Sequence, residues 1–188
     1  IKLVAGNSNR ALSEAIATYL EVPLAKCQVR RFADMEVFVE IQENVRERDV
    51  FVVQSFTEPV SDHVMELLIT LDALRSASAR RVTAVIPYFS YARSDKKDAP
   101  RISITGRLVA DLLQTAGANR VLTMTLHAPQ VHGFFGVPVD HLNALSVLAR
   151  HFRERGDLDN AIVVSPDLGN AKAAAALARL GAGSGIAL

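Results

Sequence analysis

Cysteine is almost absent from this sequence of 188 residues, in which Cys27 is the only one. A single thiol excludes an intrachain disulfide and a cysteine-based zinc site, which favours a reducing compartment. The sequence also lacks an apolar run long enough to span a bilayer, and it does not open with the charged-then-apolar pattern of a signal peptide. We therefore expect a cytoplasmic protein with no membrane partner.

A marked surplus of positive charge is missing too. The formal net charge is +1, whereas a general nucleic-acid-binding surface shows a clear basic excess, so we expect no nucleic-acid partner. The sequence contains no GxxxxGK[ST] loop, no GxGxxG after a strand and no GxSxG. These absences argue against a P-loop nucleotide binder, a dinucleotide-binding enzyme and the usual serine hydrolase.

Apolar strand patterns alternate with amphipathic helical patterns along the chain. We expect strands over residues 2–5, 27–31, 36–42, 50–54, 82–86, 120–126 and 161–164, with another beginning at 186. We expect helices over residues 10–20, 62–76, 103 or 105 to 117, 143–155 and 171–180, and a loop over 127–140. Because most connections are too long for hairpins, the pattern predicts an α/β fold with a mostly parallel sheet covered on both faces. Residues 36–42 alternate and predict a half-exposed hairpin strand.

The loop over residues 87–101 follows a buried strand that ends at Pro87. In open α/β sheets, ligands bind at the carboxyl edge of the strands, where this loop is expected. Aromatic faces can stack on a base, and Arg and Lys suit phosphate oxygens. The loop combines both types in Tyr88, Phe89, Tyr91, Arg93, Lys96, Lys97 and Arg101. The alternative is a solvated connection whose rings pack downwards.

Two other strand ends supply polar groups to the same edge, His127 and Asp167. A divalent cation such as Mg²⁺ binds through carboxylate, substrate phosphates and water, although histidine is an unusual ligand for it. The alternative for His127 is a satisfied loop histidine, and the alternative for Asp167 is a helix cap. His132 and His141 are interpreted as surface or interface residues.

Several short segments, in a fixed order along the chain, carry a resemblance to a known family. They are RFADME at 31–36, ENVR at 43–46, IPYFSYAR at 86–93, LHA at 126–128, GFF at 133–135, PVD at 138–140 and SPD at 165–167. With them the sequence closely resembles the ribose-phosphate pyrophosphokinases, also called phosphoribosyl pyrophosphate synthases.

The resemblance implies transfer of the β,γ-diphosphoryl group of Mg-ATP to the C1 hydroxyl of ribose 5-phosphate, giving phosphoribosyl pyrophosphate and AMP. It implies a phosphoribosyltransferase-type α/β domain over residues 1–142 that carries the ATP-site loops. The beginning of a second, similar domain would follow over residues 143–188. It also implies Mg²⁺ as the cofactor and a homo-oligomer of dimers that assemble into a hexamer.

By matching position, the resemblance also assigns site residues. The ATP-binding set is Phe32, Asp34, Glu36, Arg93, Ser94 and Asp98, and the metal positions are His127 and Asp167. The first three would come from a neighbouring subunit's hairpin. Ser94 departs from the family's common Gln, which shortens a nucleotide contact. Thr125 replaces the family's usual Asp before Leu-His, which removes one carboxylate near the metal. Pro129 and His132 fall in the segment that in many members helps bind regulatory phosphate or ADP, and His141 replaces a frequent Asn.

In the family, a flexible loop with the catalytic Lys and Arg and an acidic loop for ribose 5-phosphate follow a position matching Leu188. We therefore assign no catalytic residue within this sequence and expect the C-terminal part to be missing from it. A noncatalytic nucleotide-binding regulatory subunit is the alternative function. A purine or orotate phosphoribosyltransferase shares the fold, but segments 31–36 and 88–101 argue against it.

Overall fold

A computed structural model describes residues 1–156, 161–182 and 185–187. The chain divides into two compact units, Ile1–Leu142 and Asn143–Leu188. The first unit is built on a five-stranded sheet in the order β1-β4-β5-β6-β7, with every neighbouring pair parallel. Its strands are β1 (Lys2–Ala5), β4 (Asp49–Val53), β5 (Arg81–Ile86), β6 (Arg120–Met124) and β7 (Val139–Leu142).

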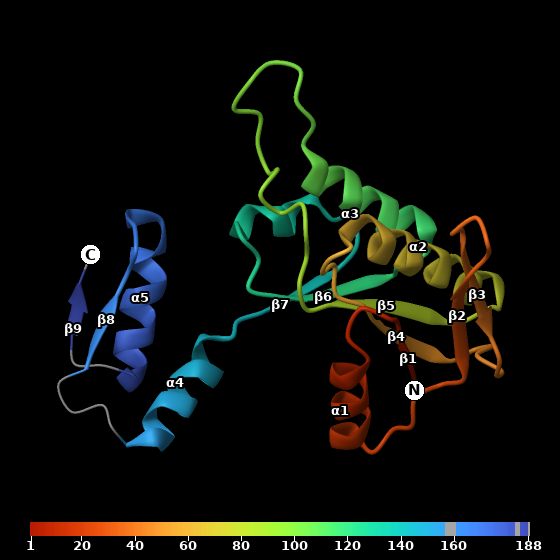
Figure 1. Cartoon of the computed structure of the whole chain (residues 1–188), viewed down its shortest axis with the longest axis horizontal. Coiled ribbons are helices and arrows are strands. Elements are labelled where there is room, and N and C mark those ends of the chain that lie inside the picture. The colour runs from red at the N-terminus through yellow and green to blue at the C-terminus, as the bar shows by residue number, and fades with distance from the viewer. Residues whose placement is uncertain (157–160, 183–184, 188) are drawn as a thin grey trace. The chain divides into compact units, whose positions relative to one another are not determined.

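Helices cover both faces of this sheet (Figure 1). α2 (Val60–Ser76) and α3 (Thr105–Ala116) lie on one face, and α1 (Arg10–Leu20) lies on the other. α2 turns a stripe of fully buried leucines, Leu67, Leu71 and Leu74, toward the strands, which is the spacing of a core-facing helix. The parallel α/β architecture predicted from the sequence is confirmed.

A buried carboxylate ties α2 to the loop that follows β1. Glu66 is only 3% exposed, and it accepts hydrogen bonds from the main-chain amide of Asn7 at 2.6 Å and from Gln54 Nε2 at 2.9 Å. Because a buried carboxylate without donors would be costly, these bonds fix the helix rotation. They hold the N-terminal end of α2 beside the carboxyl edge of the sheet.

A hairpin stands beside the sheet (Figure 1). β2 (Cys27–Arg31) and β3 (Val37–Ile41) pair antiparallel, with Arg31 opposite Val37, as the alternating pattern predicted. β3 packs against α2, and Arg31 Nη2 lies 2.9 Å from a carboxylate oxygen of Asp62 on that helix. This ion pair therefore anchors the turn end of the hairpin, and the turn over residues 32–36 lies directly beyond it.

The prediction of a loop over residues 127–140 is wrong in two respects. A 3₁₀-helix forms over Pro129–Phe134, and the last residues enter the edge strand β7. β7 has only four residues, and Asp140 and His141 interrupt the apolar pattern by which a strand is predicted. Its pairing with β6, Val121 to Val139 and Met124 to Leu142, supplies what the local pattern lacks.

The second unit begins with α4 (Leu145–Arg155), two residues later than predicted, because Asn143 Oδ1 accepts the Leu145 amide ahead of the helix. Next come β8 (Ile162–Val164), a short 3₁₀-helix (Leu168–Asn170), α5 (Ala171–Leu177), a π-helical turn (Ala178–Ala182) and β9 (Gly185–Ala187). β8 and β9 pair in parallel, so α5 lies in a β-α-β connection. No helix in the described ranges has the length and apolarity that crossing a membrane requires.

Candidate functional site

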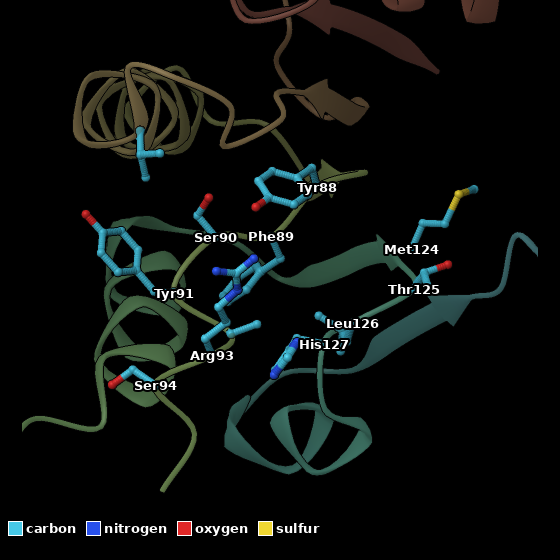
Figure 2. Close-up of a pocket in the computed structure, with 12 residues that line it drawn as sticks. Tyr88, Phe89, Ser90, Tyr91, Arg93, Ser94, Met124, Thr125, Leu126 and His127 are labelled. Atoms are coloured by element: carbon cyan, nitrogen blue, oxygen red, sulfur yellow. The ribbon is translucent and has the colours of Figure 1, made fainter. Parts of the chain in front are cut away.

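A cavity of about 570 Å³ lies at the carboxyl ends of β5 and β6 (Figure 2). The loop after β5 forms one wall, and the segment from Met124 to His127 forms the other. Val60, at the start of α2, completes the lining. The cavity therefore occupies the edge at which parallel α/β sheets bind ligands.

The loop after β5 is held by the core beneath it. Phe89 is 5% exposed and its ring packs against Phe56 and Phe135, with centroid distances of 5.6 and 5.5 Å. Ser90 Oγ donates to the Phe56 carbonyl at 2.6 Å. Tyr88 and its neighbour across the loop, Tyr91, stay exposed at the cavity. The alternative in which the rings pack downwards thus holds for Phe89 and not for the tyrosines.

Arg93 and His127 face the same space from opposite walls (Figure 2). Both side chains are exposed, and the lining residues, all within the described part of the chain, include no carboxylate. The guanidinium is a fixed positive charge with paired donors, which suits phosphate oxygens. The cavity is therefore suited to an anionic ligand.

Ser94 closes the base of the loop over residues 95–103, which we call the protruding loop (Figure 1). Its Oγ donates to the Ser103 carbonyl at 2.9 Å and accepts the Thr105 amide at 3.1 Å. The prediction that Ser103 or Thr105 caps α3 is wrong, since the helix has Ile104 at the N-cap position and no side-chain cap there. The first-turn amide is instead satisfied by a hydroxyl from eleven positions upstream.

A hydrogen bond outside the cavity links the segments that follow its two walls. Gln130 Nε2, in the 3₁₀-helix after His127, donates to Asp95 Oδ2 at 2.6 Å. Asp98 lies further out in the protruding loop, is exposed and does not line the cavity. The hydrogen bond between Gln130 and Asp95 therefore restrains the two cavity walls relative to each other.

The hairpin residues Phe32, Asp34 and Glu36 are exposed and do not line this chain's cavity. Phe32 packs edge-on against Phe38, with a centroid distance of 5.4 Å, and the Arg30 guanidinium lies 4.3 Å from the Phe38 centroid. These contacts stiffen the strand ends, while the turn at the tip faces outward.

Asp167 belongs to the second unit, whereas His127 belongs to the first. Asp167 Oδ1 accepts the Asn170 amide at 3.0 Å at the start of a 3₁₀-helix, which confirms the helix-cap alternative. The carboxylate is exposed. Its second oxygen can still accept a ligand, because capping uses Oδ1 alone.

The comparisons with known proteins agree with the resemblance seen in the sequence. A family model described as the N-terminal domain of ribose phosphate pyrophosphokinase matches residues 1–117. The chain belongs to this family. Ribose-phosphate pyrophosphokinases of Rhizobium meliloti and Deinococcus radiodurans are 58% and 60% identical to it, over 95% and 93% of this chain.

A solved crystal structure also supports the fold. The crystal structure of phosphoribosylpyrophosphate synthetase from Mycobacterium smegmatis superposes with a TM-score of 0.92 at 42% identity, covering 98% of this chain and 62% of that one. The chain spans 58% and 55% of the Rhizobium and Deinococcus relatives. It therefore corresponds to part of the length of the family's proteins.

Candidate ligands for the family's magnesium ion are sparse in the described part of the chain. Among the residues that the structure describes, no cluster of three or more His, Cys, Asp or Glu side chains could hold a metal ion by itself. His127 and Asp167 offer one imidazole and one carboxylate. Mg²⁺ commonly keeps several waters and binds substrate phosphates alongside one or two carboxylates. Each of the two residues could serve as one ligand of an ion that also binds phosphate and water.

Sequence reasoning missed one polar contact next to the cavity. His141 is exposed, as the sequence predicted for a surface or interface histidine, but its Nε2 on β7 also accepts the main-chain amide of Leu126 at 2.9 Å, which was not predicted. His132 is exposed too, with Nε2 3.2 Å from the Val139 carbonyl oxygen. No local pattern predicts a bond between residues fifteen positions apart.

Proposed function

We propose that this chain carries the ATP-binding part of a ribose-phosphate pyrophosphokinase, which transfers the diphosphoryl group of Mg-ATP to the C1 hydroxyl of ribose 5-phosphate. The products are phosphoribosyl pyrophosphate and AMP. The observation that carries the proposal is the cavity in which Arg93 faces His127 at the carboxyl edge of the sheet. Membership of the family supplies the reaction class.

Arg93 is proposed to bind the triphosphate. The guanidinium can form two parallel hydrogen bonds to a phosphate, which fixes its position as well as neutralising charge. Such transfer needs little covalent help from the protein and depends on positioning and charge neutralisation. The contacts of Phe89 and Ser94 fix the loop on both sides of Arg93 in the sequence, and the exposed Arg93 side chain lines the cavity.

His127 and Asp167 are each proposed as a ligand of Mg²⁺, which would also bind phosphate oxygens and water. When bound, the ion would polarise the β-phosphorus and stabilise the negative charge that develops on the AMP leaving group. In this proposal His127 contributes a neutral ring nitrogen at the cavity wall. Asp167 contributes the oxygen that its capping bond leaves available.

Phe32, Asp34 and Glu36 are proposed to complete the adenine site of a neighbouring subunit. They are exposed and lie outside their own chain's cavity, so a second copy is the natural recipient. The Phe32 ring can stack on the base, and the carboxylates can accept hydrogen bonds from its amino group. The working protein is then a homo-oligomer, proposed as dimers that form a hexamer, in the cytoplasm. Ser94 and Asp98 remain proposed nucleotide contacts of the loop.

Replacing Arg93 tests the proposed phosphate contact. In the native-length protein, Arg93→Ala should weaken binding of Mg-ATP roughly ten- to hundredfold, because a charge-assisted contact is lost. Arg93→Lys should recover part of it, since charge remains without the paired geometry. Titration calorimetry with a non-hydrolysable analogue measures both. Arg107→Ala is the control, because Arg107 pairs with Asp111 on α3. Equal affinity in Arg93→Ala and the control would remove Arg93 from the site.

A further inference from the structure

The turn that presents His127 has an unfavourable backbone. β6 ends at Met124, and Thr125 then adopts a φ of 47°, in the left-handed region. A β-branched residue rarely adopts this conformation, and it persists only where the surrounding contacts determine it. Leu126 follows, 8% exposed, and the next residue is His127 at the cavity. The placement of His127 therefore depends on what holds this turn.

β7 holds the turn through two consecutive residues. The Thr125 amide donates to the Leu142 carbonyl at 2.8 Å, and the Leu126 amide donates to His141 Nε2 at 2.9 Å. The first contact is main chain to main chain and is independent of side-chain identity. The second depends on the imidazole alone. His141 does not line the cavity, so its contribution is made through Leu126.

We propose that His141 is a positioning residue of this site, which fixes the turn that presents His127 by accepting the Leu126 amide. The proposal rests on the proposed function in one respect, namely that the cavity binds Mg-ATP.

The hydrogen bond to Leu126 defines which ring nitrogen of His141 carries the proton. A main-chain amide can only donate, so Nε2 carries the lone pair and the ring is neutral, with its proton on Nδ1. Because Leu126 is nearly buried, an amide without this acceptor would lose the compensation for its desolvation. The neighbouring Asp140 does not compete for the ring, since both of its oxygens accept from Arg120, at 2.5 and 2.7 Å.

The geometry of the acceptor suggests matched variants. Gln can place an amide oxygen near the position of Nε2, whereas Ala and Leu carry no acceptor at all. His141→Gln should therefore keep the function that His141→Ala and His141→Leu lose. His132→Leu is the control, because its ring approaches the carbonyl of Val139 on the same strand without touching the turn.

The first readout is amide hydrogen exchange at Leu126 in the native-length protein without nucleotide. Exchange should be slow in the wild type, His141→Gln and His132→Leu, and faster in His141→Leu and His141→Ala. The second readout is the affinity for a non-hydrolysable Mg-ATP analogue. It should fall roughly ten- to hundredfold in the same two variants, which is the usual effect of removing a residue that orients a metal ligand. A loss of affinity without loss of the overall fold marks a positioning role.

The two readouts separate failure of this inference from failure of the proposed function. A wild type that does not bind the analogue contradicts the proposed function, while exchange at Leu126 still tests the hydrogen bond. A wild type that binds, with unchanged affinity in His141→Ala, overturns the inference, whether or not exchange is faster. If His141→Leu does not fold, the comparison of Gln with Ala decides: equal affinities in those two variants also overturn it.

Discussion

The Ser94 hydroxyl joins the beginning and the end of the protruding loop. It donates to the Ser103 carbonyl and accepts the Thr105 amide, so one atom closes the loop and satisfies the first turn of α3. Arg93 directly precedes it, at the cavity. Ser94 therefore couples the stability of the loop to the position of Arg93, the residue proposed to bind phosphate.

Ser94→Ala should destabilise the protein and weaken nucleotide binding together. Loss of a capping hydroxyl costs about 0.5–2 kcal/mol in the free energy of unfolding. The cost can be measured by urea denaturation of the native-length protein. Ser103→Ala is the matched control, because only the main-chain carbonyl of Ser103 takes part in the contact. If the two variants are equally stable, the Ser94 contacts contribute nothing to the loop.

Residue roles were predictable where the contact is local in sequence. The cap made by Asp167 spans three residues and follows from its place before a helix. The Ser94 contact with Thr105 and the His141 contact with Leu126 span eleven and fifteen residues. The first forms when the loop after β5 closes on the start of α3, and the second forms when β7 pairs beside β6, so no local pattern in the sequence indicates them.

The pairing of β6 with β7 is reinforced by an ion pair at the start of the two strands. Arg120 and Asp140 form two hydrogen bonds, and this contact lowers the pKa of Asp140 and raises the pKa of Arg120. A carboxylate with a lowered pKa stabilises the fold above the pKa it has when unfolded, about 4. That stabilisation is lost as the pH falls through its folded-state pKa.

Arg120→Leu should therefore reduce stability at neutral pH, and the difference from the wild type should shrink as the pH falls below about 4. The effect is small and salt-sensitive, because the pair is partly exposed. Denaturant unfolding at a series of pH values measures it, with Arg107→Leu as a control on a helix surface. A difference that stays constant down to pH about 2 would contradict this account of Asp140.

Most elements were predictable because their signals are strong and local. The alternation over 36–42 predicted a hairpin strand, and the apolar runs at 50–54 and 82–86 predicted buried parallel strands. β7 was missed because it is an edge strand of four residues whose exposed polar side chains hide the pattern. Edge strands are defined by their neighbour more than by their own sequence.

At the scale of the whole molecule, the proposal requires a site built from two copies. Within one chain, the exposed turn at 32–36 and the cavity lined by Arg93 and His127 do not share residues. The sequence predicted the sharing only through the family resemblance, since no composition or periodicity reveals which surface a second copy contacts.

Mixing two impaired variants tests this sharing. Assayed at an ATP concentration near the wild-type KM, Phe32→Ala and Arg93→Ala should each lose most of the activity alone, since each weakens nucleotide binding at every site. In co-expressed mixed oligomers, sites that join an intact hairpin with an intact cavity should return about a quarter of the wild-type activity, if subunits assemble at random. Separately purified variants, combined without exchange of subunits, are the control. Activity that stays at the level of the single variants would contradict a shared site.

The central claim is that the native-length protein transfers a diphosphoryl group from ATP to ribose 5-phosphate. The most direct test incubates it with Mg²⁺, ribose 5-phosphate and ATP labelled at the β-phosphate, and follows the label. We predict label on the sugar, with AMP formed in equal amount. Nucleotide binding without transfer would contradict the claim and would assign the protein to the noncatalytic regulatory subunits, with Arg93 as a binding residue only.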